Sequence, residues 1–189
     1  MKVIRFIVLI SVLILEVDYL CAQENDKAKS KEQKKIEKQK AKEEAKKLEE
    51  AQWQELYALF ENKDIVFQGE MIDGFAIDSD INFVRIYGDS AIVQFANGIG
   101  GWQNGIGGVT VTGWIDNYKL GKKKPGKAID LRITIILKRG QGFWGPLTIG
   151  INALSFDSAR IIIDVRGGYM YGFIRSNKDA FIFTGNTPN

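Results

Sequence analysis

The spacing of hydrophobic residues changes near residue 62 and divides the chain into two unlike parts. Between residues 23 and 62 Lys, Glu, Ala and Gln dominate, without Gly or Pro, and these residues favour helix. Acidic side chains precede basic ones by three or four positions, as in Glu43 and Lys47, which stabilises a helix further. The pattern predicts a charged helix over residues 23–62 without the heptad seam of a coiled coil.

The last turns of the predicted helix carry an apolar stripe. Its members recur at helical spacing: Leu48, Trp53, Leu56, Tyr57, Leu59 and Phe60. Such a stripe needs a partner surface, so we expect it to dock on the domain that follows. For the charged part before it, a spacer is the simpler interpretation, and a helix that binds an envelope protein is the alternative.

From about residue 63 onward, short runs rich in Ile, Val, Phe, Thr and Tyr replace the helix formers. Apolar and polar residues alternate strictly in residues 129–137, which predicts a strand with one buried face. Residues 81–96 predict a hairpin that turns at Gly88 and Asp89. Its alternation places Val84, Ile86, Ala91, Val93 and Phe95 toward a core, and Arg85, Tyr87 and Gln94 on the other face.

Further strands are predicted about ten residues apart, with turn signals between them. This spacing favours a mainly β fold, either an antiparallel β-sandwich or a partly open β-barrel, preceded by the long charged helix. The further strands cover residues 65–72, 109–115, 147–152, 159–165, 169–175 and 181–183.

The first residues have the pattern of a secretory signal. A basic start at Lys2 and Arg5 precedes an apolar run, residues 7–15, that is too short to cross a bilayer as a helix. Ala22 is a small residue at which a signal peptidase can cut. We therefore expect residues 1–22 to be removed and the protein to be exported, periplasmic or envelope-associated.

Lipid anchoring at Cys21 is the alternative that we favour less, because bulky Leu20 stands where lipoprotein signals have a small residue. With cleavage after Ala22, the expected organisation has three parts. They are residues 1–22 as signal peptide, 23–62 as charged helix and 63–189 as one antiparallel β domain, which is long enough for a core of its own.

The composition restricts the chemistry that the chain can perform. It has no histidine and a single cysteine, Cys21, which signal cleavage would remove. Ser-His-Asp and Cys-His catalysis are thereby excluded, as are zinc sites built on His or Cys. We expect no enzyme, no cofactor and no metal site. The formal charge of +3 is spread along the chain and gives no argument for nucleic acid.

The unit NGIGG occurs twice in residues 97–108, on either side of Trp102 and Gln103. A phosphate-binding loop would need Lys-Ser/Thr at its end or a helix after it, whereas another strand is predicted here. The simpler interpretation is a long connection between strands, since glycine supplies backbone freedom. The functional interpretation is a loop at the mouth of a barrel that offers Trp102 to a ligand.

A second glycine-rich connection, residues 138–146, holds Phe143 and Trp144 beside two cations. Aromatic side chains in such a loop either close the end of a sheet or stack on a ligand. Binding is the better explanation if both connections lie at one end of the domain. The candidate ligand-binding residues are Asn97, Trp102, Asn104, Phe143 and Trp144.

Two other motifs have simpler explanations. Lys122 to Lys124 belong to a basic turn that predicts a solvated hairpin connection. Asp78 and Asp80 form the one close carboxylate pair of the β half, but they lack the glycine and distal glutamate of a calcium loop. A carboxylate-dependent hydrolase would need them to face each other across a cleft.

Several segments in this order resemble one known family. An exported leader and a charged helix precede FVRIYGDSAIVQFANG, a Gly-rich segment, YKLGKKKPGK before an alternating strand, and a closing RGGYMYGFI. This arrangement resembles the domain-of-unknown-function family 4251, found in exported proteins of Gram-negative bacteria, over nearly the whole chain. The matching positions are Asp89, Ser90, Lys119, Lys124, Gly126, Tyr171, Gly172 and Ile174.

The doubled NGIGG and the loop with Phe143 and Trp144 depart from that family's pattern. Because the family has no established activity, the resemblance supplies no catalytic residues. We expect an exported envelope protein whose β domain binds an apolar or amphipathic small molecule without catalysis. A structural protein of an envelope assembly, joined through the helix, is the second hypothesis, and the carboxylate-dependent hydrolase is the third.

Overall fold

The computed structural model describes residues 33–99, 104–121, 124–138, 145–163 and 169–186 of the 189-residue chain. Residues 33–61 are helical, and the chain divides into two compact units after Leu48. The described side chains before Glu49 are all exposed, as their charge predicts. Within the described residues, no helix combines the length and the apolar character that a membrane span requires.

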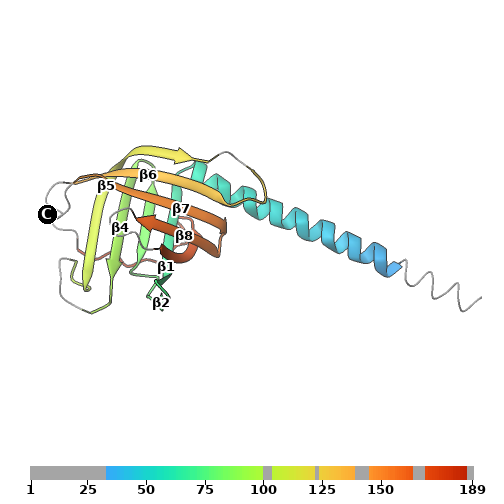
Figure 1. Cartoon of the computed structure of the whole chain (residues 1–189), viewed down its shortest axis with the longest axis horizontal. Coiled ribbons are helices and arrows are strands. Elements are labelled where there is room, and N and C mark those ends of the chain that lie inside the picture. The colour runs from blue at the N-terminus through green and yellow to red at the C-terminus, as the bar shows by residue number, and fades with distance from the viewer. Residues whose placement is uncertain (1–32, 100–103, 122–123, 139–144, 164–168, 187–189) are drawn as a thin grey trace, which may run out of the picture. The chain divides into compact units, whose positions relative to one another are not determined.

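Nine antiparallel strands are described in the unit that begins at Glu49 (Figure 1). They are β1 (Asp64–Ile72), β2 (Phe75–Ala76), β3 (Phe83–Tyr87), β4 (Ser90–Ala96), β5 (Gly108–Leu120), β6 (Ile129–Leu137), β7 (Leu147–Ser155), β8 (Ser158–Ile163) and β9 (Tyr169–Arg175).

Eight of these strands close into a barrel. From β3 onward each strand pairs with the next, and β1 pairs with both β3 and β9, while β2 pairs with β1. The mainly β fold predicted from the alternation is confirmed. Of the two predicted architectures the chain adopts the barrel, and the β1–β9 pairing closes it.

Closure depends on glycines where another backbone passes too close for a side chain. A Cβ on Gly172 in β9 would lie 1.9 Å from the carbonyl oxygen of Gln68, and a Cβ on Gly113 in β5 would lie 2.3 Å from that of Ile136. Glycine within a strand permits such tight approaches and bends. The shift in β1–β9 register next to Gly172 marks a bulge at the same place.

Branched aliphatic side chains fill the barrel interior. The inward residues of β6 and β7 meet in pairs, with Ile133 opposite Ile149 and Ile135 opposite Leu147. All four are buried, whereas Arg132, between two inward residues, is exposed. The strict alternation of residues 129–137 therefore predicted the inward face of β6 correctly.

The helical stripe packs into this core. Leu56 and Phe60 are fully buried, and the rings of Trp53 and Tyr57 stack with their centroids 5.1 Å apart. The predicted docking of the last helical turns is confirmed, except that Leu48, at the start of the stripe, is exposed.

Hydrogen bonds fix the stripe against the β5–β6 hairpin. The indole N–H of Trp53 donates to the carbonyl of Lys127 (2.6 Å), and the Tyr57 hydroxyl donates to the carbonyl of Gly121 (3.2 Å). From β5, the Tyr118 hydroxyl donates to the carbonyl of Phe60 (2.5 Å) and so satisfies a carbonyl at the helix end. The helix end and this hairpin thus close one end of the barrel together.

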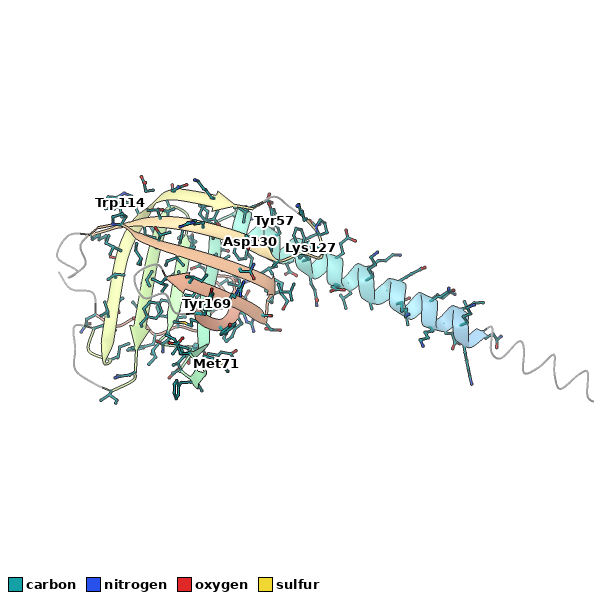
Figure 2. All side chains as sticks on the ribbon, in the orientation of Figure 1. Tyr57, Met71, Trp114, Lys127, Asp130 and Tyr169 are labelled. Carbon is teal, nitrogen blue, oxygen red and sulfur yellow. The ribbon has the colours of Figure 1, made fainter. Side chains whose placement is uncertain are left out.

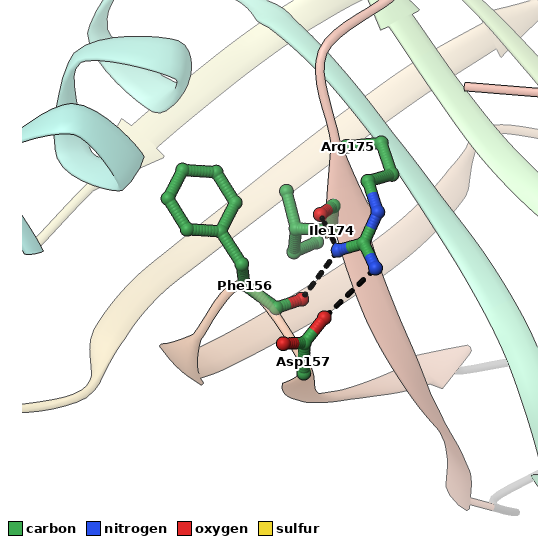
Figure 3. A network of polar contacts seen from close by, with 4 residues as sticks. All are labelled: Phe156, Asp157, Ile174 and Arg175. Atoms are coloured by element: carbon green, nitrogen blue, oxygen red, sulfur yellow. Dashed lines mark hydrogen bonds and ion pairs between the residues drawn. The ribbon is translucent and has the colours of Figure 1, made fainter. Parts of the chain in front are cut away.

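Arg175 joins the β7–β8 turn to the end of β9 (Figure 3). Its guanidinium donates to the carbonyls of Phe156 (3.4 Å) and Ile174 (2.8 Å) and to the carboxylate of Asp157 (2.8 Å). The same guanidinium lies over the ring of Phe173, 4.5 Å from its centroid. These contacts hold the β7–β8 turn against the end of β9.

The C-terminal segment, residues 181–186, lies along the outer face of β1, β3 and β4. The side-chain amide of Gln68 donates to the carbonyl of Phe181 (2.9 Å), and that of Gln94 donates to the carbonyl of Phe183 (2.7 Å). Gln94 points away from the barrel core, as the alternation predicts, yet it is fully buried because this segment covers it.

The prediction of a strand over residues 181–183 is wrong. This segment is extended, but side-chain amides of the barrel bind its carbonyls, and the Phe183 N–H donates to the carbonyl of Asp80 (2.8 Å) in a connection. A strand would need backbone partners along a neighbouring strand. The hydrogen bonds of residues 181–183 are instead made with side chains of β1 and β4 and with the connection that holds Asp80.

Replacing Leu56 with Ala should lower the free energy of unfolding by about 2–5 kcal/mol, because the substitution leaves a void at the fully buried helix–barrel contact. Urea unfolding followed by circular dichroism measures this. Leu48→Ala is the matched control, since Leu48 is 61% exposed, and it should change the value by less than about 0.5 kcal/mol. Equal losses in the two variants would contradict the docking.

Burial, with a smaller contribution from Tyr57, raises the pKa of the Tyr118 hydroxyl well above its usual value of 10.0. The folded state therefore holds this proton more tightly than the unfolded chain does. The resulting stability is complete below about pH 10 and is lost as the pH rises above it. The melting temperature should fall as the pH rises above about 10, and Tyr118→Phe should flatten that fall. An equal flattening by Tyr87→Phe, at an exposed position, would contradict this origin.

Candidate functional site

Because neighbouring strands run in opposite directions, successive connections lie at alternate ends of the barrel (Figure 1). The β3–β4, β5–β6 and β7–β8 turns share the end that the helix closes. The connections after β1, β4, β6 and β8 therefore share the opposite end. Both glycine-rich connections predicted from the sequence, residues 97–107 and 138–146, join strands at this opposite end.

Inward apolar side chains surround this opposite end and are only half-buried. We call them the rim: Ile72, Phe95, Val109, Leu137 and Ile163. They pack against the buried core and leave part of their surface exposed. The rim is thus an apolar surface on the inner wall of the barrel, next to the filled interior.

The alternation in the sequence placed Phe95, Leu137 and Ile163 of the rim on core-facing sides of their strands, but it placed no rim residue in a site. Phe95 pairs with Val109, and both lie one step beyond the buried pair of Val93 and Val111. Alternation gives the same signal for a core position and a rim position. A core position and a rim position differ only in their distance from the end of the strand, and the closed sheet determines where each strand ends.

Each copy of the NGIGG unit forms its own turn. The side-chain oxygen of Asn97 accepts a hydrogen bond from the N–H of Ile99 (2.9 Å), and that of Asn104 accepts one from Ile106 (3.1 Å). The copies also pair, because the Gly98 N–H donates to the carbonyl of Ile106 (3.1 Å). The repeat is therefore a pair of Asx turns that hold each other. Ligand contact by these two asparagines stays a prediction.

Asn104 also belongs to a buried polar network on the outer face. Its side-chain oxygen accepts from the Gly108 N–H (2.9 Å), and its amide donates to the Thr110 hydroxyl (3.3 Å). Thr110 donates in turn to the side-chain oxygen of Gln94 (2.8 Å), which also accepts from the Gly185 N–H (2.8 Å). The network connects the β4–β5 connection to the C-terminal segment.

Trp102, Phe143 and Trp144 lie outside the described residues. Their contact with a ligand at the rim stays a prediction. The structure adds that rim residues Phe95 and Val109 flank the first connection, and that rim residue Leu137 precedes the second.

The two aspartates lie in the connection between β2 and β3. The exposed Asp78 carboxylate accepts a hydrogen bond from the backbone N–H of Asp80 (3.0 Å), which forms another Asx turn. Among the described residues, no three Cys, Asp or Glu side chains come together in a way that could hold a metal ion. The Asp78 carboxylate therefore has a local role in the turn.

The crystal structure of a DUF4251 family protein from Bacteroides eggerthii DSM 20697 is similar to this structure, with 19% sequence identity and a TM-score of 0.51. The similarity covers 71% of this chain and 94% of that chain. No protein-family model matches the chain, and no curated protein matches it. The resemblance predicted from the order of segments is thus confirmed at the level of the fold, and it assigns no activity.

The two asparagines of the repeat provide a matched pair of variants. Asn104→Ala should lower the free energy of unfolding by about 1–3 kcal/mol, because it leaves buried hydrogen-bond donors and acceptors without partners. Asn97→Ala removes one exposed turn bond and should cost less than about 0.5 kcal/mol. Chemical denaturation of both variants measures the difference. An equal loss of unfolding free energy in the two variants would contradict the stabilising role of the buried Asn104 network.

Proposed function

We propose that this chain is exported to the envelope, where its barrel binds an apolar or amphipathic small molecule at the rim without transforming it. The observation that carries the proposal is the half-buried ring of inward apolar side chains at the end opposite the helix. An eight-stranded barrel has an interior of the size that either fills with side chains or holds one small ligand. The rim is the place where this interior meets solvent.

The packing restricts how deep a ligand reaches. Ile133, Ile149 and Ile161 are almost fully buried in the middle of the barrel, and the helical stripe occupies the other end. A ligand therefore binds at the mouth, with an acyl end or a flat apolar ring against the rim. A polar group on the same molecule stays in solvent, which is why an amphipathic ligand fits.

The sequence supports binding over turnover. A chain without histidine lacks the side chain that most often transfers protons near neutral pH. The Asp78 carboxylate, which the hydrolase hypothesis needs, is engaged with the backbone of Asp80. The export part of the proposal is supported by the basic start and short apolar run of the leader.

A structural role through the helix is the second candidate. It is favoured by the exposure of every described side chain before Glu49, among them Ile36 and Leu48, which are 47% and 61% exposed. Exposed apolar side chains such as these can pack against a helix or strand of a partner protein. Cross-linking in cells distinguishes the two functions, because a scaffold gives one discrete partner through residues 33–48.

The protein purified from its own envelope fraction, with a new terminus at Gln23, should carry a bound small molecule in native mass spectrometry. The purified chain should also bind the apolar fluorophore 1-anilinonaphthalene-8-sulfonate. Val109→Thr combined with Leu137→Gln should weaken that binding by at least about tenfold, or about 1.4 kcal/mol, because it makes the rim polar.

Leu154→Gln is the control for this double variant, since Leu154 is 59% exposed and lies outside the rim. It should leave fluorophore affinity unchanged. Repeated purification without any bound species, together with equal weakening by the control, would reject the rim as a ligand site.

A further inference from the structure

The C-terminal segment uses one of the two edges of its backbone to bind the barrel. The carbonyls of Phe181 and Phe183 accept from side-chain amides of β1 and β4. The N–H of Phe183 donates to the β2–β3 connection (2.8 Å), and that of Gly185 donates to a side chain of β4 (2.8 Å). In an extended chain the N–H and C=O of one residue point to the same side, and those of the next residue point to the opposite side. Residues 181, 183 and 185 therefore direct their backbone groups toward the barrel.

The second edge of the segment consists of the N–H and C=O groups of Ile182 and Thr184. In the part of the chain that the structure describes, neither residue forms a backbone hydrogen bond. Because the residues beside them face the barrel, this second edge points away from it. An extended backbone with a row of unpaired N–H and C=O groups is a template for pairing with another strand.

The side chains of the segment favour such pairing. Residues 180–186, AFIFTGN, contain no charged residue and no proline, two features that commonly protect an edge. Phe, Ile and Thr are residues that favour strands. Phe181 and Phe183, two positions apart, point to the same side of the extended chain and are 77% and 57% exposed. The partner that suits this segment is therefore an uncharged extended strand with an apolar side chain.

Exposed aromatic side chains elsewhere on the barrel lack this combination. Trp114 of β5 and Tyr169 of β9, labelled in Figure 2, are exposed as well. Their strands have neighbours on both sides in the closed sheet and so offer no edge. The strand β2 has one neighbour, but it is only two residues long, and very short edge strands are protected from pairing.

The second edge of the segment is complementary to itself. When two copies run antiparallel about a two-fold axis, the N–H and C=O groups of Ile182 in one copy pair with those of Thr184 in the other. Phe183 then lies opposite Phe183 of the second copy, in the non-hydrogen-bonded pair where cross-strand side chains approach most closely. Phe181 lies opposite Gly185, which has no side chain to obstruct the ring. A second copy of this chain thus satisfies both the backbone edge and the exposed rings.

We propose that the C-terminal segment joins two copies of this chain by antiparallel pairing of its second edge, with Phe183 at the two-fold axis. The hydrogen bonds to the barrel hold each segment extended before it pairs, which lowers the entropy lost on association. Because the segment is short, the interface is small, and small interfaces give weak and reversible association. The proposal does not depend on a ligand at the rim.

Cysteine cross-linking tests the register of the pairing. A protein that begins at Gln23 has no cysteine, because Cys21 is the only one in the chain. Phe183→Cys should form an intermolecular disulfide under mild oxidation, since the Cα atoms of the pair at the axis are about 4.5 Å apart, within disulfide range. Electrophoresis without reducing agent measures the cross-linked fraction.

Phe181→Cys is the matched control for the cross-link. Phe181 is the more exposed of the two residues, so random collision would cross-link it at least as well. In the proposed register its two copies are displaced along the strands by about 13 Å, which is too far for a disulfide. Equal cross-linking of both variants, or none in Phe183→Cys, would overturn the proposal.

Charge at the axis provides a second test. Sedimentation equilibrium of the purified protein should show monomer and dimer between about 10 µM and 1 mM. Phe183→Asp and Phe183→Lys should each weaken the dimer at least about tenfold, because like charges then face each other. An equimolar mixture of the two variants should restore it as a heterodimer.

The melting temperatures of the two charged variants should match that of the unchanged protein at low concentration, since Phe183 is exposed in the single copy. This control separates loss of pairing from loss of fold. A purified protein that stays monomeric up to about 1 mM would overturn the proposal. A mixture of the folded variants that stays as monomeric as each variant alone would overturn it too.

Discussion

The pairing of β1 with β9 is the contact on which the rest of the structure depends. It joins the first and last barrel strands, far apart in the sequence, and turns a meander with two edges into a closed sheet. Gly172 permits it, since the Gln68 carbonyl passes where a side chain would otherwise stand. Once the sheet is closed, every inward residue shares one core and every connection belongs to one of two ends.

The ends then acquire different roles. At one end Leu56 and Phe60 of the helix enter the core, and the hydroxyl of Tyr118 satisfies a carbonyl at the helix terminus. At the other end no helix is described, and the inward side chains of the rim remain half-buried. The asymmetry gives the barrel one closed end and one apolar mouth, which is the arrangement that the proposed binding function uses.

The outer face is also more than a solvated surface. Over β1, β3 and β4 the C-terminal segment buries Gln68 and Gln94, whose amides recognise its backbone instead of its side chains. At Gly150 of β7, by contrast, an added Cβ would meet nothing within 4 Å. The chain thus covers part of its own outer face, over β1, β3 and β4.

The sequence alone determined the helix stripe, the hairpin at Gly88 and Asp89 and the inward face of β6, because each depends on spacing between near neighbours. It also determined which chemistry the chain lacks. Tertiary structure decided that the sheet closes, that Gln94 is buried, that residues 181–183 cross the sheet instead of joining it, and that Phe95 and Val109 stand at a rim. The reason is physical: alternation records which way a side chain points, whereas burial depends on what distant backbone lies above it.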